Sequence, residues 1–387
     1  MGEVLNMKFY GKGFIFLLFL IVGAAVFPGK VQGELSVSAR SAILMEQETG
    51  RVLYEKNPHE KRRVASITKI MTAIIAIESG KLEETVTVSE RATRTEGSSI
   101  YLKPGEKIKL KHLVYGLMLR SGNDAAVAIA EYVGGSVEGF VFLMNQKSAE
   151  IGMKNTNFAN PHGLDDSDDH YSTAYDMAIL TKYAMENETF REISGTKVYR
   201  APNPGEKWDR VWKNKNRLLT EFYKYSTGGK TGYTKKAGRT LVSTASKNGM
   251  DLIAVTIYAP DDWNDHVNMF ETAYKKYKMA TVLNEGTIKR IDHPFYRKKV
   301  YAASEYQFPV AKGEKDLFRI EYKLSEPKRE WKGGNIPDIV GKAVIYFEDR
   351  PVKELPLYYK KEKKEKDSLF NRFKETFTSF IGVKTNG

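Results

Sequence analysis

Residues Arg62–Gly80, RRVASITKIMTAIIAIESG, contain the stretch on which the fold prediction depends. From Ser66 onward, apolar residues recur at helical spacing and predict a helix with one buried stripe. The stripe consists of Ile67, Ile70, Met71, Ile74 and Ile75. Lys69 lies inside this apolar helix, one turn after the serine. A buried lysine is costly unless it is paired or neutral, so its position needs an explanation.

The spacing of Ser66 and Lys69 suggests catalysis. Side chains at i and i+3 meet on one face of a helix. A serine hydroxyl is a weak nucleophile that needs a base within hydrogen-bond reach. A lysine serves as that base only if its pKa falls towards neutral, which burial and a second nearby cation both promote. Because S-x-x-K alone is a short motif, a capping serine with a lysine that reaches solvent is the alternative.

Two further motifs support the catalytic interpretation. Ser121–Gly122–Asn123 interrupts two predicted helices, Leu110–Arg120 and Asp124–Val133. Lys230–Thr231–Gly232 lies in a glycine-rich run just before a predicted strand. In this order, S-x-x-K, S-x-N and K-T-G form the motif set of the serine penicillin-recognising enzymes.

The chain resembles one family within that superfamily, the low-molecular-weight D-alanyl-D-alanine carboxypeptidases, which are penicillin-binding proteins. The resemblance covers Ala39 to about Tyr277 and is carried by ASITKIMTA, LMLRSGNDAAVAIAE, NPHGL, HYSTAYDMAIL and STGGKTGYTKKAGRTLVSTA. TGRVLYEKN, RTEGSSIYL and YGLMLRSGNDAAVAIAEYVGGS are most similar to the sporulation-associated members from spore-forming Gram-positive bacteria. The resemblance implies a penicillin-binding/β-lactamase-like transpeptidase domain.

The resemblance also implies roles for four catalytic residues. Ser66 attacks the carbonyl of the penultimate D-Ala and forms an acyl-enzyme, and Lys69 takes its proton. Ser121, with Asn123, relays a proton to the departing D-Ala amine and holds the lysine in place.

A second group of residues is expected to bind substrate. Lys230 depresses the pKa of the catalytic lysine and attracts the terminal carboxylate of the substrate, which Thr231 also binds. The backbone N–H groups of Ser66 and Tyr233 match the family's oxyanion hole. Gly232 and the glycines before the lysine leave the strand edge bare, so an extended peptide can dock as an extra strand.

Other polar residues invite weaker interpretations. Arg239 either assists carboxylate binding or is an ordinary strand residue, since nothing in the sequence orients it. His162 and Asp165 suggest a metal site, but the acidic run lacks EF-hand spacing, so no metal and no cofactor are predicted. Ser172 or Thr173 is expected to start the next helix, which Asp176 would brace.

Strand patterns flank the helical middle of the chain. Ala42–Met45 and Arg51–Tyr54 are predicted strands, and RTLVSTAS and MDLIAVTIYA form a predicted hairpin that turns at Asn248–Gly249. A helix near Val267–Tyr277 follows. Strands at both ends with helices between them predict an α/β (α+β) fold, in which one antiparallel sheet lies beside a helical cluster.

The chain divides into four predicted segments: a signal peptide (1–33), the catalytic domain (34–278), a small β domain (279–359) and a basic linker with an amphipathic helix (360–387). Six tail residues fall on one helical face: Leu369, Phe370, Phe373, Phe377, Phe380 and Ile381. With the lysine-rich linker before it, this helix is expected to lie on a membrane surface. Packing on the β domain is the alternative.

Composition indicates an exported protein. The 387 residues carry a net charge of +13 and no cysteine. Such a charge suits nucleic acid or an anionic surface such as a membrane or cell wall. Two lysines precede the apolar run Phe14–Phe27, and Val31–Gly33 offers small residues for cleavage, which is typical of a signal peptide; an uncleaved anchor is the alternative. Export argues against nucleic acid. Together with the tail helix, it predicts peripheral attachment to the outer face of the cytoplasmic membrane, with association with the forespore as the alternative.

The predicted function is therefore a serine-type D-alanyl-D-alanine carboxypeptidase in cell-wall or spore-cortex maturation. Its partners would be peptidoglycan stem peptides ending in D-Ala-D-Ala, with β-lactams as covalent inhibitors. Class A β-lactamases deacylate through a glutamate after the second motif, but Asn155–Asp176 contains none. Slow hydrolysis of β-lactams, and hence inhibition by them, is therefore expected. Endopeptidase or transpeptidase activity stays open because only the acceptor differs, while three intact motifs argue against a non-enzymatic wall-binding protein.

Overall fold

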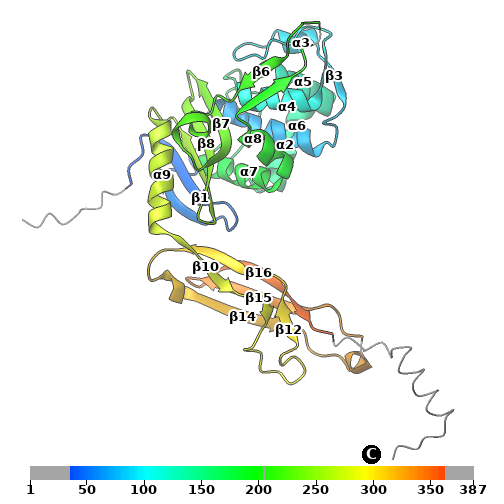
Figure 1. Ribbon diagram of the computed structural model, residues 1–387, viewed down its shortest axis with the longest axis vertical. Coiled ribbons are helices and arrows are strands. Elements are labelled where there is room, and N and C mark those ends of the chain that lie inside the picture. The colour runs from blue at the N-terminus through cyan, green and yellow to red at the C-terminus, as the bar shows by residue number, and fades with distance from the viewer. Residues whose placement is uncertain (1–34, 204, 334, 362–387) are drawn as a thin grey trace, which may run out of the picture.

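The structure is a computed structural model that describes residues 35–203, 205–333 and 335–361. The predicted signal peptide and C-terminal helix lie outside the described residues. Figure 1 shows an upper body of mixed helix and sheet and a lower body built of strands. The two bodies are connected where α9 (Asp262–Lys276) leads into β10 (Lys278–Leu283).

The upper body is organised on a five-stranded antiparallel sheet in the order β2-β1-β9-β8-β7. β1 pairs with β9, so segments from both ends of the region close one sheet, as predicted. The predicted turn at Asn248–Gly249 connects β8 and β9, and both of its residues have positive φ. The strands are β1 (Ser41–Glu46), β2 (Val52–Lys56), β7 (Ser226–Thr234), β8 (Gly238–Lys247) and β9 (Met250–Ile257).

The two faces of this sheet carry different cores, because successive side chains of a strand point to opposite sides. In β1, Ala42 and Leu44 belong to the cluster that contains Met269 of α9. Ile43 and Met45 belong to the cluster built by the helices on the other face. The sheet is therefore buried on both faces, with α9 on one side and the helical cluster on the other (Figure 1).

α9 begins at Asp262, earlier than the predicted start near Val267. Asp262 and Asp265 lie in its first turn, where carboxylates interact favourably with the helix dipole. Both are buried, and they accept hydrogen bonds from Arg239 and Ser38 respectively. The prediction began too late because it followed the apolar pattern, which a polar first turn does not show.

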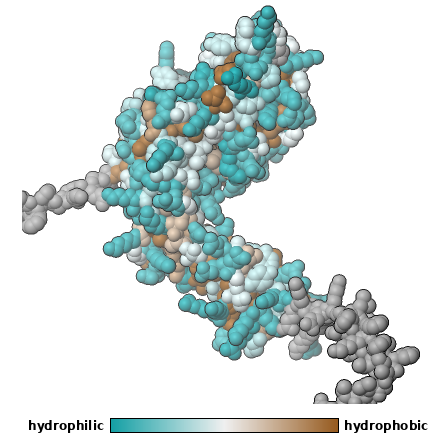
Figure 2. Space-filling view, in the orientation of Figure 1, coloured by the Kyte–Doolittle hydropathy of each residue, from teal (hydrophilic) through white to brown (hydrophobic). Residues whose placement is uncertain are grey.

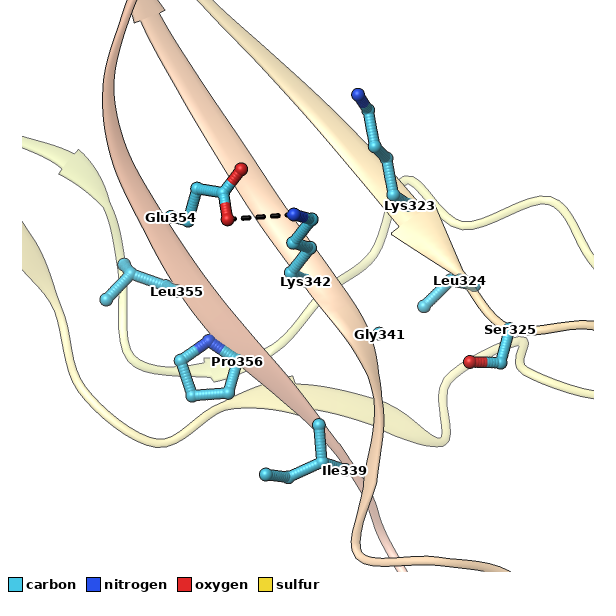
Figure 3. Close-up of a pocket in the computed structure, with 9 residues that line it drawn as sticks. All are labelled: Lys323, Leu324, Ser325, Ile339, Gly341, Lys342, Glu354, Leu355 and Pro356. Carbon is cyan, nitrogen blue, oxygen red and sulfur yellow. Dashed lines mark hydrogen bonds and ion pairs between the residues drawn. The ribbon is translucent and has the colours of Figure 1, made fainter.

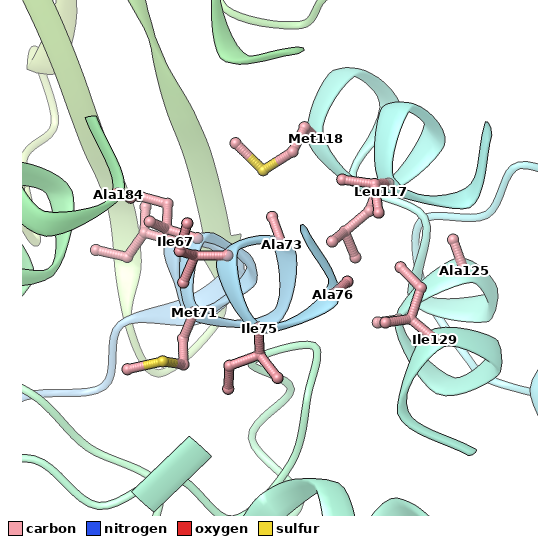
Figure 4. Packing of buried hydrophobic residues seen from close by; sticks show 14 of the residues in the cluster. Ile67, Met71, Ala73, Ile75, Ala76, Leu117, Met118, Ala125, Ile129 and Ala184 are labelled. Atoms are coloured by element: carbon pink, nitrogen blue, oxygen red, sulfur yellow. The ribbon is translucent and has the colours of Figure 1, made fainter. Parts of the chain in front are cut away.

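The helical cluster has α2 (Lys69–Glu78) at its centre, where apolar side chains of α2 face residues such as Leu117 and Ile129 of its neighbours (Figure 4). The helix predicted from Ser66 is divided, since Ala65–Thr68 form a 3-10 turn and α2 begins after it. The surrounding elements are α4 (Leu110–Tyr115), the π-helical turn Gly116–Arg120, α5 (Asn123–Gly134), α6 (Val137–Glu150), α7 (Ala174–Glu186) and α8 (Glu188–Gly195).

Within the described part of the chain, no single helix has the length and apolar character needed to cross a membrane. α5 and α6 meet that criterion only as a pair, which is bent by 83°.

The lower body confirms the predicted all-β region. A two-stranded sheet pairs β10 with β13, and a five-stranded sheet has the order β11-β12-β16-β15-β14. Buried residues between 283 and 359 form a hydrophobic cluster of their own. The further strands of the lower body are β11 (Gly286–Thr287), β12 (Val300–Ala302), β13 (Tyr306–Val310), β14 (Phe318–Leu324), β15 (Ile339–Phe347) and β16 (Arg350–Tyr359).

A groove of about 610 Å³ marks the surface of this lower body (Figure 3). Apolar residues such as Ile339 and Leu355 line it, beside an ion pair between Lys342 and Glu354 at 2.8 Å. It lies in the opposite body from the three sequence motifs.

Arg51, in the turn between β1 and β2, ties the two bodies together. Its guanidinium donates to both carboxylate oxygens of Glu314, at 2.8 and 2.9 Å, and to the carbonyl of Pro309. It also lies over three aromatic rings, those of Tyr277, Phe308 and Phe347. A bidentate pair of this kind is directional, so it favours one relative placement of the two bodies.

Candidate active site

The predicted nucleophile lies in the 3-10 turn that leads into α2. Ser66 is half-buried, whereas Ala65 and Ile67 on either side of it are buried. Ala65 has a φ of +52°, which is unfavourable for a residue with a side chain. Strained backbone of this kind persists where the surrounding packing enforces it, and it is found preferentially at functional sites.

Lys69 reaches back from the first turn of α2 and is completely buried. Its Nζ donates to the hydroxyl of Ser66 at 3.0 Å, to Oδ1 of Asn123 at 2.7 Å and to the carbonyl of His162 at 2.7 Å. The three acceptors fix the amine in one place, next to the predicted nucleophile.

The environment lowers the pKa of Lys69 well below its ordinary value. Burial is the largest cause, followed by the charges of Lys230 and Lys215, while Asp124 acts in the opposite direction. A lower pKa increases the neutral fraction of the amine at a given pH, and only the neutral amine can accept a proton.

The second motif stands at the junction of the π-helical turn and α5. Ser121 has a left-handed conformation with φ +65°, and Asn123 is the first residue of α5. Asn123 is held through its own amide groups, since its backbone N–H and its side-chain NH₂ donate to the carbonyls of Ser98 and Glu96, both at 2.6 Å. Its Oδ1 is thereby aimed at the amine of Lys69.

In the described part of the chain, Ser121 is hydrogen-bonded to Lys230 and not to Lys69, the partner that the prediction gave it. Its hydroxyl accepts a hydrogen bond from Nζ of Lys230 at 3.0 Å, and among the described residues no hydrogen bond joins it to Lys69. Of the two residues expected to hold the catalytic lysine, only Asn123 does so. The left-handed backbone at Ser121 turns its side chain towards the third motif instead.

The third motif lies on β7, which is an edge strand of the sheet. Lys230 is buried, and its Nζ also donates to the carbonyl of Thr231 at 2.7 Å. Burial, with a contribution from the charge of Lys215, lowers the pKa of Lys230 to about 7. Thr231 and Gly232 are partly exposed and Tyr233 is exposed, so the outer edge of the strand is accessible.

Gly232 brings β7 against the nucleophile turn. A Cβ at this position would lie 2.9 Å from the backbone nitrogen of Ser66 and 2.4 Å from Oγ1 of Thr240. Only a glycine allows this approach, which places the N–H of Ser66 beside the strand that carries Tyr233. The structure thus brings all eight predicted site residues together around one edge of the sheet.

A loop that no motif identified holds the catalytic lysine from the opposite side. The carbonyl of His162 accepts from Lys69, and the next residue, Gly163, has a φ of +85°. A Cβ on Gly163 would lie 1.9 Å from the carbonyl oxygen of Ala65, so the loop and the 3-10 turn touch through their backbones. Every residue has a backbone carbonyl, so the residue type does not show which carbonyl binds the lysine. The segment NPHGL was nevertheless among those that carried the family resemblance.

The same loop shows no arrangement for a metal. Burial, with the charge of the catalytic lysine, lowers the pKa of the His162 ring to about 3. Asp165 accepts from the backbone N–H of Lys236 at 3.3 Å. Within the described ranges, no group of three or more His, Asp or Glu side chains could hold a metal ion.

The predicted cap is confirmed, because Thr173 precedes α7 and accepts from the N–H of Asp176 at 3.0 Å.

Two further basic residues, Arg239 and Lys215, lie near the candidate site. Arg239 forms an ion pair with Asp262 at 2.6 Å, which supports the structural interpretation of that arginine. Lys215 was not predicted as a site residue, yet its charge lowers the pKa of both Lys69 and Lys230. Its Nζ donates to Oγ of Ser98 at 3.2 Å, in the loop that also holds the second motif.

Comparison with known proteins gives a consistent result. A family model described as D-alanyl-D-alanine carboxypeptidase matches residues 29–261. The D-alanyl-D-alanine carboxypeptidase DacF of Bacillus subtilis is 39% identical over 324 residues, covering 81% of this chain and 78% of that protein. The D-alanyl-D-alanine carboxypeptidase DacC of Escherichia coli is 32% identical over 384 residues, covering 92% of this chain and 91% of that protein.

Solved structures share the fold. Penicillin binding protein 5 from Haemophilus influenzae has a TM-score of 0.68 at 26% identity, covering 84% of this chain and 98% of that one. A mutant of a Streptomyces DD-transpeptidase has a TM-score of 0.58 at 30% identity, covering 62% of this chain and 97% of that one. Together with the motif set, these similarities show that the chain belongs to the D-alanyl-D-alanine carboxypeptidase family of serine peptidases.

Proposed function

We propose that the protein removes the terminal D-Ala from peptidoglycan stem peptides that end in D-Ala-D-Ala. One observation carries the proposal: the amine of the buried Lys69 lies 3.0 Å from the hydroxyl of Ser66. A base at hydrogen-bond distance, with a pKa lowered by its surroundings, is what a serine nucleophile requires.

In the proposed reaction, Lys69 takes the proton of the Ser66 hydroxyl as its Oγ attacks the carbonyl carbon of the penultimate D-Ala. The C–N bond to the terminal D-Ala then breaks. The proton that Lys69 took then reaches the departing amine through Ser121, whose hydroxyl first turns from Lys230, its hydrogen-bond partner in the structure, towards Lys69. Water, deprotonated by the same lysine, hydrolyses the acyl-enzyme and restores the serine.

Substrate binding in this proposal uses the edge of β7. Lys230 and Thr231 bind the terminal carboxylate, while the N–H groups of Ser66 and Tyr233 stabilise the oxyanion, where loss of one donor typically costs on the order of 10²–10³ in rate. Because β7 is an edge strand, an extended peptide can pair with it through backbone hydrogen bonds.

Other reactions on this scaffold differ in the group that accepts the acyl chain. Transfer to an amine would make the protein a transpeptidase, and cleavage of a cross-link would make it an endopeptidase. A β-lactam would acylate the same serine, and because residues 155–176 contain no glutamate, we expect its release to be slow. We therefore propose inhibition by β-lactams with at most weak β-lactamase activity.

The test measures D-Ala release from a diacyl-D-Ala-D-Ala peptide beside turnover of penicillin. We expect the wild type to release D-Ala and to form a long-lived adduct with fluorescent penicillin, and Ser66→Ala to do neither. Circular dichroism should show an unchanged fold in the variant. A penicilloyl adduct on Ser66→Ala in intact-mass spectrometry would remove Ser66 as the nucleophile.

We also propose the location and organisation that the sequence predicts: export by residues 1–33, a catalytic domain at 34–278, a β domain at 279–359, and peripheral attachment to the membrane by 360–387. We propose a role in spore-cortex maturation from the resemblance to the sporulation-associated members.

The membrane proposal can be tested through the basic tail, because each basic residue near an anionic surface contributes about 1 kcal/mol to membrane binding. Truncation after Tyr359 should abolish co-sedimentation with anionic vesicles and leave D-Ala release intact; equal binding of both forms would show that the tail is not the anchor.

A further inference from the structure

A cleft outside the proposed catalytic machinery lies beside the second motif. It has a volume of about 580 Å³ and opens between residues 99–103 and the hairpin formed by β5 (Val198–Ala201) and β6 (Arg210–Lys213). Arg120, which directly precedes Ser121, is one of its lining residues. The cleft therefore begins next to the site where a bound substrate would react. Figure 1 shows that β6, on its other side, lies over the helical cluster.

One wall presents a strained and exposed aromatic residue. Tyr101 is 83% exposed and has a φ of +61°, a conformation that a bulky side chain rarely adopts. The buried carboxylate of Asp124 enforces it by accepting from the backbone N–H groups of Ile100 and Leu102, both at 3.1 Å. Ser99 joins this network, since it donates to Asp124 and accepts from the N–H of Tyr101. The strained backbone at Tyr101 does not bury its ring, so it adds nothing to the packing of the core. Such strain is common at functional sites, which suggests that the exposed ring binds a ligand.

The opposite wall presents a second exposed aromatic residue, in the loop between β5 and β6. Trp208 is 66% exposed. The hairpin beneath it is held by Arg210, whose side chain pairs with Glu106, and both side chains of this pair are largely buried. The ring of Tyr199 in β5 stacks on that of Tyr115 in α4, with centroids 3.6 Å apart. Trp208 thus stands in the loop of a hairpin whose two strands are held by packing and by an ion pair.

The charges of the cleft are largely engaged with one another. Lys103 pairs with Glu206 at 3.0 Å across the cleft, and Arg120 donates to the carbonyl of Lys213 at 3.2 Å. Arg210 and Lys213 pair with Glu106 and Glu221, so three of the four basic side chains that line the cleft are in ion pairs, and the cleft offers aromatic faces and polar groups of both signs. A mostly neutral ligand with apolar faces and many hydrogen-bonding groups fits this lining best.

We propose that this cleft binds a saccharide, namely the glycan chain of peptidoglycan. Sugar rings present C–H faces that pack on aromatic rings, here those of Tyr101 and Trp208, and hydroxyl and acetamido groups that hydrogen-bond to polar side chains such as Asn203 and Asp209. Rigid aromatic residues bind at a low entropic cost. The inference rests on the proposed function, since the glycan is the polymer that carries the stem peptides. Holding it beside the catalytic centre would favour attached peptides over free ones.

The direct test titrates the full chain with N,N′,N″,N‴-tetraacetylchitotetraose, a neutral N-acetylglucosamine tetramer, in a calorimeter. Trp208→Ala should weaken binding at least about tenfold, as expected for truncation of an aromatic anchor, and Trp208→Phe should restore part of it. Phe142→Ala is the matched control, because Phe142 is 69% exposed on α6 and does not line the cleft. It should bind the tetramer like the wild type.

The functional test compares kcat/KM for D-Ala release from a glycan-linked pentapeptide and from the free pentapeptide. We expect the ratio of the two to fall in Trp208→Ala and to stay constant in Phe142→Ala. Absent tetramer binding in the wild type, equal binding by Trp208→Ala, or binding of a neutral peptide in place of the sugar would overturn the inference. Failure of D-Ala release from the free peptide would instead count against the proposed function.

Discussion

The contact between Gly163 and the nucleophile turn offers a sharp test of how the catalytic lysine is positioned. The substitution Gly163→Ala adds one methyl group at a residue with φ +85°. That methyl carbon would lie 1.9 Å from the carbonyl oxygen of Ala65 and 2.9 Å from Oγ1 of Thr68. Both partners belong to the 3-10 turn that carries Ser66, so the loop cannot stay where it is.

The size of the displacement follows from these distances. Because real Cβ atoms essentially never approach another heavy atom closer than 3.0 Å, the loop and the turn must separate by about 1.1 Å. The hydrogen bond from Lys69 to the carbonyl of His162 is 2.7 Å long, and the same shift would stretch it beyond hydrogen-bond range. A misplacement of about 1 Å in an active site can cost about 10²-fold in rate. We therefore expect kcat/KM for D-Ala release to fall by about that factor.

The control is Gly152→Ala, because Gly152 has nearly the same φ, +84°, and a Cβ there meets nothing within 4 Å. Both variants carry the cost of a left-handed alanine, about 1–2 kcal/mol, so their stabilities share this loss. Only Gly163→Ala should also lose activity. The assays are steady-state D-Ala release at a temperature well below either unfolding midpoint, together with thermal unfolding. If the two variants retained equal activity, the loop carbonyl would have no part in positioning Lys69.

Two further predictions concern the buried lysines. Lys69→Arg should acylate with fluorescent penicillin at least about 10²-fold more slowly than the wild type, because a guanidinium does not deprotonate at working pH; near-normal acylation would show that Lys69 is not the base. For Lys230, with its pKa near 7 in the free enzyme, kcat/KM for a substrate with a free terminal carboxylate should fall as pH rises through about 7, since the charge that pairs with the carboxylate is lost. A C-terminal amide should lack this fall, and an identical pH profile for both substrates would remove Lys230 as the carboxylate partner.

The sequence predicted the parts of the molecule that depend on local pattern. Local patterns located strands β1, β2, β8 and β9 and the regions of α2, α4, α5 and α9, whereas α6 and α8 were not predicted. The turn at Asn248–Gly249 followed from residue type alone. The pairing of Ser66 with Lys69 followed from their spacing along one turn. The presence of strands at both ends of the region was enough to predict that β1 and β9 would close one sheet.

The missing parts depend on backbone atoms and on contacts between distant segments. A carbonyl oxygen such as that of His162 is present in every residue, so no motif reveals it as a ligand of the lysine. The partner of Ser121 depends on a left-handed backbone at a residue other than glycine, which residue type does not indicate. Lys215 was missed because its effect on the two buried lysines is electrostatic, and its position comes from tertiary packing.

The first turn of α5 shows how the catalytic centre and the neighbouring cleft depend on each other. Asn123 aims its Oδ1 at the amine of Lys69, while the next residue, Asp124, fixes the loop that presents the exposed aromatic ring. A buried carboxylate so close to the catalytic amine raises the lysine pKa and so opposes its use as a base. Burial and the charges of Lys230 and Lys215 rank above it and set the net direction downward. The charges of Lys230 and Lys215 therefore add to burial in offsetting the effect of a structural aspartate on the pKa of a lysine that must lose its proton.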